Sequence, residues 1–428
     1  MVLGLAFKFI KSFAFKTVRS VFGFYQGIFW AINGTYIQLW RSRFASNYSW
    51  SAHVQTVWFR HKLDLVLEPS SPTNFITTHY SFENPRYVLK KNVTLYYVTR
   101  TQAVFVETDP KIDAPHSDNG SFLRVAQFLN ARRIITMPIA TFHQLAESVG
   151  DAKGRLIFVS NPTRCGSTLL SQVFEETNRV LSFSEPDALN AIGLYEGRMP
   201  QKELDRLVVN SVRLLCKPVD RPIAAYILKT TAPTIDAVPM FIRLFPDSKQ
   251  VFMYREGLKV AQSLFRSGKQ MPLLELTFLV TPLSQTLTRK AVESMGLSPD
   301  MFKVKCIDGF VFSLYVWAVI LDKYNQYLNE EMDIAAVRYE DLVKHPLQAT
   351  QAVFKYCGLP VEWAHDGIRA MDKDAQRKSP LSMKNLRKHD VAGLTPQRKK
   401  QTDEICDQFN LPRIPEPCLL EGTITHVG

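Results

Sequence analysis

The sequence has no aspartate or glutamate before Asp64, so its N-terminal part carries only positive charge. Within this part, residues 20–40 have no charged side chain at all. That stretch is long enough to cross a bilayer, but Gln26, Asn33, Thr35 and Gln38 make it unusually polar for a spanning helix. We therefore expect residues 1–45 to form a membrane-anchoring or amphipathic segment.

The charge pattern of residues 2–22 favours a helix that lies at a membrane surface. At about 100° per residue, Lys8, Lys11, Lys16 and Arg19 fall on one side and the other side is rich in phenylalanine. Three interpretations stay open: a signal anchor with its basic flank in the cytoplasm, an interfacial anchor that contacts membrane lipid, and a mitochondrial presequence. Membrane attachment ranks first among them.

Metal-binding cysteine patterns are also lacking. The six cysteines show no Cys-x-x-Cys and no Cys/His ligand spacing, which argues against zinc, and we expect no metal site. Their even number permits disulfides without favouring them. These cysteines are Cys165, Cys216, Cys306, Cys357, Cys406 and Cys418.

Nucleic acid is not the expected partner, although the formal net charge is +12. The basic residues are dispersed, and no zinc finger, helix-turn-helix or basic stripe with interleaved aromatics is present. The charge suits an anionic cofactor, an anionic acceptor or a membrane surface. With 428 residues, the chain can bury a large core and hold one α/β domain with a further module.

Residues 156–170 predict a phosphate-binding loop between a strand and a helix. The apolar strand 156–159 runs into a turn, and Gly166 precedes the two hydroxyl residues Ser167 and Thr168, which open the helix. Amides at a helix N-terminus and the helix dipole attract an anion, and Gly166 leaves room for its approach. The Gly-Lys pair of nucleotide triphosphatases is missing. Arg164 supplies the cation instead, and a guanidinium can hold two phosphate oxygens.

The strand pattern predicts an α/β fold, with a P-loop-type parallel sheet flanked by helices. Strands are expected at 156–159, 180–183, 225–228, 250–254 and 334–337, within a domain spanning 151–428. Ligands bind at the carboxyl ends of such strands, where Arg164, Glu185, Lys229 and Arg255 follow. Before this domain, 46–150 reads as a small accessory α+β module with a hairpin at 93–98 and 103–107 and a helix at 122–129.

The loop Arg164-Cys165-Gly166-Ser167-Thr168-Leu169-Leu170 resembles the sulfotransferase family. There it holds the 5′-phosphosulfate of 3′-phosphoadenosine 5′-phosphosulfate (PAPS), which is released as PAP. The resemblance covers about residues 155–360. Many members have proline directly before the loop cation, whereas Thr163 intervenes here after Pro162. Cys165 reads as a small filler within the cofactor loop rather than a nucleophile.

The resemblance implies roles for two further pairs of residues. Arg255, after a strand, and Ser263, in the next helix, would bind the 3′-phosphate of the nucleotide. Arg377 and Lys378 are weakly similar to the Arg-Lys lid that covers the nucleotide in cytosolic members. The segment Arg338-Tyr339-Glu340-Asp341-Leu342 resembles an architectural turn, in which the acids cap the next helix; the upstream apolar run 310–321 around Trp317 reads as a buried core helix.

The catalytic base that the resemblance implies is Glu185. Cytosolic members carry histidine in a Lys-Thr-His-x-Pro run, and here Thr231 takes that place after Lys229. The Glu185-Pro186 pair is similar to carbohydrate sulfotransferases, where a carboxylate at this point is the base. Arg164 would stabilise the leaving group, and Lys229 would contact the transferring sulfuryl group.

The expected function is therefore PAPS-dependent sulfuryl transfer to a hydroxyl or amine of a small-molecule or glycan acceptor. The Golgi-type members favour a lumenal enzyme with a single N-terminal anchor, and the sequons at Asn47, Asn92 and Asn119 agree with a glycoprotein. Two alternatives remain: a P-loop nucleotide kinase or hydrolase, and a catalytically inactive membrane protein that binds PAP or PAPS.

Overall fold

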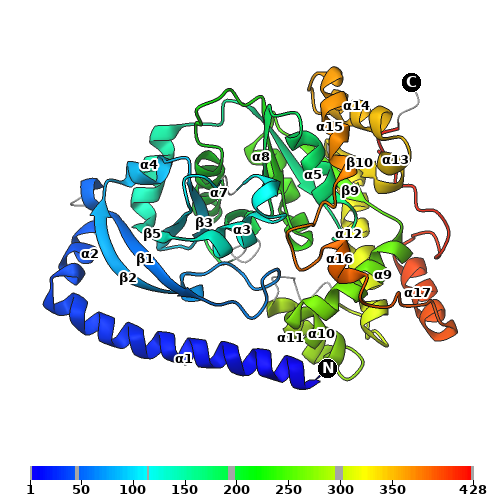
Figure 1. The fold of residues 1–428 in the computed structure, drawn as a ribbon. Helices are drawn as coiled ribbons and strands as arrows, with labels where there is room; N and C mark the ends of the chain where they lie inside the picture. The colour runs from blue at the N-terminus through cyan, green and yellow to red at the C-terminus, as the bar shows by residue number, and fades with distance from the viewer. Residues whose placement is uncertain (1, 44–47, 113–114, 191–197, 295–301, 426–428) are drawn as a thin grey trace. The chain divides into compact units, whose positions relative to one another are not determined.

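The computed structural model describes residues 2–43, 48–112, 115–190, 198–294 and 302–425, which form two compact units (Figure 1). Unit 1 comprises Met1–Ala114, Leu123–Lys153 and Asp187–Arg221, and unit 2 comprises Pro115–Phe122, Gly154–Pro186 and Pro222–Gly428. Both units are discontinuous along the chain, whereas the ranges expected from the sequence were contiguous. Each unit is built on its own sheet.

Unit 1 contains an antiparallel sheet with strand order β2-β1-β5-β4-β3. Its predicted hairpin is confirmed, because β3 pairs with β4 from Val93↔Glu107 to Val98↔Ala103. The strands are β1 (Ala52–Arg60), β2 (Phe75–Glu83), β3 (Val93–Val98), β4 (Gln102–Glu107) and β5 (Arg133–Pro138). Its helices are α1 (Val2–Ile32), α2 (Thr35–Arg43), α3 (Leu123–Asn130), α4 (Ile139–Val149), α6 (Asp187–Asn190) and α7 (Gln201–Leu215).

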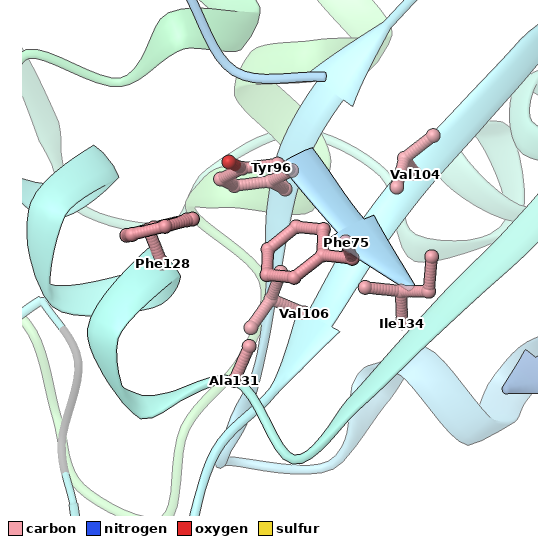
Figure 2. Packing of buried hydrophobic residues seen from close by; sticks show 7 residues of the cluster. All are labelled: Phe75, Tyr96, Val104, Val106, Phe128, Ala131 and Ile134. Carbon is pink, nitrogen blue, oxygen red and sulfur yellow. The ribbon is translucent and has the colours of Figure 1, made fainter. Parts of the chain in front are cut away.

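An aromatic and β-branched cluster forms part of the core of unit 1 (Figure 2). The Phe75 ring lies between Tyr96 and Phe128, with ring centroids 5.7 and 5.6 Å apart. Burial of such side chains stabilises the sheet by about 1.5–3 kcal/mol each. The other members are Val104, Val106, Ala131 and Ile134.

The N-terminal segment forms two helices rather than one amphipathic helix ending near residue 22. Helix α1 continues to Ile32, and Gly34, with a φ of 77°, separates it from α2. The Asn33 carboxamide accepts hydrogen bonds from the backbone and side chain of Thr35 and so caps α2. In the described part of the chain, no helix is long and apolar enough to cross a membrane.

The three sequons differ in what the structure records for them. Asn47 lies outside the described residues. The Asn92 side-chain amide, the group that a glycan would join, donates to the Thr108 carbonyl oxygen at 2.7 Å. Asn119 ends the short 3₁₀ helix Ser117–Asn119 in unit 2.

Unit 2 contains the predicted parallel sheet, with strand order β10-β9-β6-β8-β7. The strands are β6 (Arg155–Ser160), β7 (Val180–Ser184), β8 (Ala225–Lys229), β9 (Lys249–Tyr254) and β10 (Ile334–Arg338). Each predicted strand is confirmed with one or two further residues at its ends. The α/β class is therefore correct for this part of the chain.

The register of the parallel sheet aligns the ends of its strands. Val159 and Ser184 both pair with Lys229, and Arg338 pairs with Tyr254. Residues that follow the strands consequently share one edge of the sheet. The helices are α5 (Ser167–Glu175), α8 (Val238–Leu244), α9 (Gly257–Ser267), α10 (Pro272–Val280), α11 (Gln285–Ser294), α12 (Gly309–Asn329), α13 (Tyr339–Lys344), α14 (Pro346–Tyr356), α15 (Ala364–Gly367), α16 (Met383–Leu386) and α17 (Pro396–Gln408).

Helix α12 is the core helix expected around Trp317. The Asp308 carboxylate caps it by accepting from the amides of Phe310 and Val311 at 3.0 Å. Trp317 is 1% exposed, and its indole N–H donates to the Arg255 carbonyl oxygen at 3.0 Å. The helix therefore supports Arg255, which directly follows strand β9 and belongs to the candidate site.

Candidate active site

The loop between β6 and α5 has the backbone of an anion cradle. Thr163, Arg164 and Gly166 have φ values of 67°, 49° and 92°, an uncommon run of left-handed residues. The Asn161 side chain holds this shape, because it accepts from the Thr163 amide and donates to the Thr230 carbonyl oxygen. Loops that contain left-handed residues can form concavities that bind an anion through backbone N–H groups. Helix α5 then begins at Ser167, and its N-cap residue Gly166 supplies no side-chain hydrogen bond to the first-turn amides.

Packing gives the glycine of this loop a role that the sequence did not indicate. A Cβ at Gly166 would lie 2.3 Å from Cδ2 of Tyr339. Gly166 also adopts a left-handed φ that other residues rarely accept. Close packing of β10–α13 against the loop therefore requires glycine here.

Arg164 is half-buried and makes two side-chain contacts. Its Nε donates to the Ser263 hydroxyl at 3.0 Å, and its Nη1 donates to the Gln376 side-chain oxygen. Burial, together with nearby Arg255, lowers the pKa of Arg164 to about 10, so it remains a cation at neutral pH. The structure thus joins two residues that the sequence analysis assigned to opposite ends of a nucleotide.

Arg255 follows β9 and lies over the Tyr339 ring, with its guanidinium carbon 4.3 Å from the ring centroid. Its Nε is 3.9 Å from a Glu340 carboxylate oxygen, yet this buried nitrogen has no hydrogen-bond partner in the described part of the chain. Glu340 instead accepts from the Glu256 amide at the start of α9. Glu340 and Asp341 stand in the first turn of α13, as expected, and the Glu340 side chain serves the start of the neighbouring helix α9 as well.

A cavity of about 570 Å³ adjoins Arg255. It is lined by the starts of α9 and α13, by Trp317, and by residues of the segment 412–418. Burial raises the pKa of Glu340, one of its lining acids. Arg255 therefore lies on an accessible concave surface of unit 2.

Lys229 and Glu185 form a close ion pair. Lys229 is 1% exposed, and its Nζ lies 2.7 Å from the Glu185 carboxylate and 3.4 Å from the Thr168 hydroxyl. The Phe122 ring packs 5.2 Å from the same ammonium. Glu185 has a left-handed φ of 58°, and its amide donates to the Lys229 carbonyl oxygen. The predicted base and the predicted lysine therefore act as one unit, which Thr168 links to the loop.

Cys165 and Ser167 of the loop are both buried. The Cys165 thiol is fully buried and donates to the Met253 carbonyl oxygen, and burial raises its pKa to about 11, which argues against a nucleophilic role. Ser167 is also buried, at 5% exposure. Thr231, in the position of the cytosolic histidine, lies with its hydroxyl 3.2 Å from that of Thr234.

Arg377 and Lys378 bind an acidic residue of the protein itself. The Arg377 guanidinium pairs with the Asp118 carboxylate, and the Lys378 ammonium donates to the Asp118 carbonyl oxygen. The same segment contacts the loop region, because the Gln172 side chain donates to the Ala375 carbonyl oxygen at 3.0 Å. The structure thus brings residues 375–378 close to α5, with both cations occupied.

Four residues of this region were absent from the predicted site: Asp118, Phe122, Tyr339 and Gln376. Tyr339 stood in the segment 338–342, which was assigned to architecture, and Phe122 stood at the start of the helix expected at 122–129. The contacts of Asp118, Phe122 and Gln376 join positions far apart along the chain, so no local pattern could reveal them.

No family model matches the chain, and no curated protein matches it. Solved structures do align with it. Mouse sulfotransferase SULT7A1 complexed with PAP aligns at 14% identity over 64% of this chain and 90% of that chain, with a TM-score of 0.36. Sulfotransferase STF9 from Mycobacterium avium aligns at 12% identity over 63% and 79%, and a sulfotransferase from Alicyclobacillus acidocaldarius at 11% over 60% and 96%; both TM-scores are 0.35.

Proposed function

We propose that this chain is a sulfotransferase that moves the sulfuryl group of PAPS to a hydroxyl or amine acceptor. The observation that carries the proposal is the placement of a buried Lys229–Glu185 pair against Thr168, beside a loop that presents Arg164 and the amides of a helix N-terminus. A cation, a carboxylate and an anion cradle are the parts that sulfuryl transfer requires.

The residues at hand fit the nucleotide. Arg255 Nε is buried and lacks a hydrogen-bond partner among the described residues, as expected of a donor reserved for an anion. We assign the 5′-phosphate to Arg164, Ser167, Thr168 and the loop amides, and the 3′-phosphate to Arg255 and Ser263. Bound PAPS would supply an activated sulfuryl group. The side chains of this protein would orient PAPS and stabilise its negative charge.

The transfer itself needs one base and one leaving-group stabiliser. The acceptor oxygen or nitrogen forms its bond to sulfur while the bond from sulfur to the bridging oxygen breaks, and the acceptor proton passes to the Glu185 carboxylate. Arg164 and Lys229 stabilise the negative charge on the released phosphate and on the moving sulfuryl oxygens. Removal of one such donor should cost about 3 kcal/mol, which is a rate decrease of about a hundredfold.

A carbohydrate or other small hydroxyl-bearing molecule is the acceptor class that we favour. The support is the Glu185-Pro186 pair, whose carboxylate follows strand β7 and pairs with Lys229. The histidine that cytosolic members carry is replaced here by Thr231. A screen with sulfur-35-labelled PAPS against glycans, lipids, steroids and tyrosine peptides would identify the acceptor.

Nucleotide binding separates this proposal from its alternatives. In calorimetric titrations, a sulfotransferase should bind PAP without magnesium and should bind ATP with magnesium far more weakly. Preference for magnesium-ATP would favour a kinase or hydrolase. Binding of PAP with no labelled product from any acceptor in the screen would favour an inactive nucleotide-binding relative.

A further inference from the structure

Helix α1 of unit 1 is attached to its sheet through a narrow stripe. The Arg19 guanidinium donates to the Phe75 carbonyl oxygen, and the Gln26 side chain donates to the Thr77 carbonyl oxygen. The Phe15 ring lies 5.3 Å from His61, and the Trp30 ring lies 5.2 Å from His53. At about 100° per residue these four helix positions span an arc of only about 60°.

The opposite side of α1 is apolar and faces outward. Its residues have exposed fractions of 46–79%, far above what an apolar face that packs on a core would show. The Thr17 hydroxyl on this side donates back to the Phe13 carbonyl oxygen of the same helix. We call this the outer face of α1; it comprises Phe7, Ile10, Phe13, Val18, Val21, Phe24, Tyr25, Ile28 and Ile32.

The polarity of α1 is therefore opposite to that of an ordinary surface helix. Arg19 and Gln26 point to the protein and make hydrogen bonds there, while the large apolar side chains of the outer face are exposed. Figure 1 shows this long helix running beside β1 and β2. An uncovered apolar face of this length marks an interaction surface.

The charges around the outer face indicate what covers it. Lys11 and Lys16 border it on either side, and Arg41 and Arg43 follow in α2, while no acidic residue precedes Asp64. Lysine stems can lie along an apolar surface and extend their ammonium groups to phosphate headgroups. Exposed Tyr36 and Trp40 of α2 add the aromatic rings that favour the interface between lipid and water.

We propose that α1 lies flat on an anionic lipid membrane, with its outer face inserted among the acyl chains and its basic residues at the headgroups. The helix is fixed to unit 1 by the stripe of Phe15, Arg19, Gln26 and Trp30, so it holds the protein at the membrane surface. This proposal is independent of the proposed enzymatic function.

The test uses the full chain and sedimentation with vesicles of phosphatidylcholine containing about 30% phosphatidylserine, or of phosphatidylcholine alone. We expect binding to the anionic vesicles that weakens about tenfold or more in the Ile10→Asp, Val21→Asp double variant. Leu283→Asp is the matched control, since it places the same charge on an exposed leucine of unit 2 and should bind as the unchanged protein does. Lys11→Ala with Lys16→Ala should reduce binding to anionic vesicles only.

Three results would overturn the proposal. The first is no binding of the unchanged chain to anionic vesicles, or equal binding by the Ile10→Asp, Val21→Asp variant. The second is protein that stays in the membrane pellet after washing with alkaline carbonate, which releases interfacial helices and retains spanning ones. The third is a dimer in lipid-free sedimentation that the same double variant dissociates, because a second copy would then cover the outer face.

Discussion

The Lys229 ammonium lies 2.7 Å from the Glu185 carboxylate, at the paired ends of the parallel strands β8 and β7. A lysine that is 1% exposed needs such a counter-ion, because an unpaired buried charge is costly. The pair also keeps the carboxylate fixed near Thr168 and the loop. Structure and proposed chemistry therefore depend on the same contact.

Replacement of Glu185 by glutamine should separate binding from catalysis. The Glu185→Gln side chain can still accept a hydrogen bond from Lys229, but it cannot take the acceptor proton. We expect PAP affinity near that of the unchanged protein and a decrease in kcat of about 10²–10⁴. Calorimetry and a labelled-PAPS assay measure the two quantities. Glu176→Gln, at the exposed partner of Lys373, is the control, and weaker PAP binding with an unchanged kcat would make Glu185 a structural residue.

Replacement of Arg164 should abolish or strongly weaken PAP binding. Arg164→Ala removes the loop cation and its contacts to Ser263 and Gln376. Arg164→Lys keeps the charge but cannot reproduce the two-sided contact of a guanidinium, so we expect only partial recovery. The exposed Arg369→Ala should bind PAP normally. Unchanged PAP affinity in Arg164→Ala by calorimetry would remove the central claim of the proposed function.

Much of unit 2 could be predicted from local patterns. Each of the five parallel strands is a short apolar run. Glu185 and Arg255 directly follow β7 and β9, Lys229 ends β8, and Arg164 lies in the loop after β6. In a parallel sheet those positions share an edge, so their proximity could be expected from strand order alone. The loop glycine could likewise be identified as special, but its close contact with Tyr339 could not.

The remaining contacts could not be predicted because they connect distant positions. Asp118 and Arg377 are 259 residues apart in the chain, and Arg164 and Gln376 are 212 apart. The grouping of residues 187–221 with the antiparallel sheet has no local signal either, since a helix such as α7 reads the same in either unit. Tertiary packing alone decides these relationships.

The 3′-phosphate assignment predicts different effects for its two residues. Arg255→Ala removes a buried donor that has no partner among the described residues, so the preference for PAP over adenosine 5′-phosphate should fall about tenfold or more. Ser263→Ala also removes the hydrogen-bond acceptor of Arg164 Nε, so it should weaken the binding of both nucleotides. Calorimetric titration of each variant with PAP and with adenosine 5′-phosphate measures the two affinities. An unchanged preference in Arg255→Ala would show that the 3′-phosphate is held elsewhere.

Asp118 should compete with the nucleotide for the side chains of Arg377 and Lys378. Asp118→Ala frees the Arg377 guanidinium, which should increase PAP affinity about two- to fivefold, the range expected for loss of an exposed ion pair. Adding Arg377→Ala should cancel the gain. Glu176→Ala is a matched control, since it breaks the neighbouring exposed pair with Lys373. Weaker PAP binding in Asp118→Ala would instead mean that Asp118 positions these cations for the nucleotide.

Gly166→Ala should destabilise unit 2 and distort the loop. The new methyl would lie 2.3 Å from the Tyr339 ring, at a residue with a φ of 92°. Overpacking and a strained backbone together should lower the free energy of unfolding by about 2–4 kcal/mol. The matched control is Gly393→Ala, where nothing lies within 4 Å of the added carbon. Thermal unfolding measures the stability of the two variants.

A second variant separates the two causes of this loss. Combining Gly166→Ala with Tyr339→Leu removes the ring that the methyl meets but leaves the left-handed φ, so stability should recover in part. PAP affinity should stay reduced, because the Arg255 guanidinium stacks on the Tyr339 ring, with its carbon 4.3 Å from the ring centroid, and leucine cannot replace that ring. If Gly166→Ala has the same melting temperature as the unchanged protein and binds PAP equally well, then the loop does not hold the close contact with Tyr339 in solution.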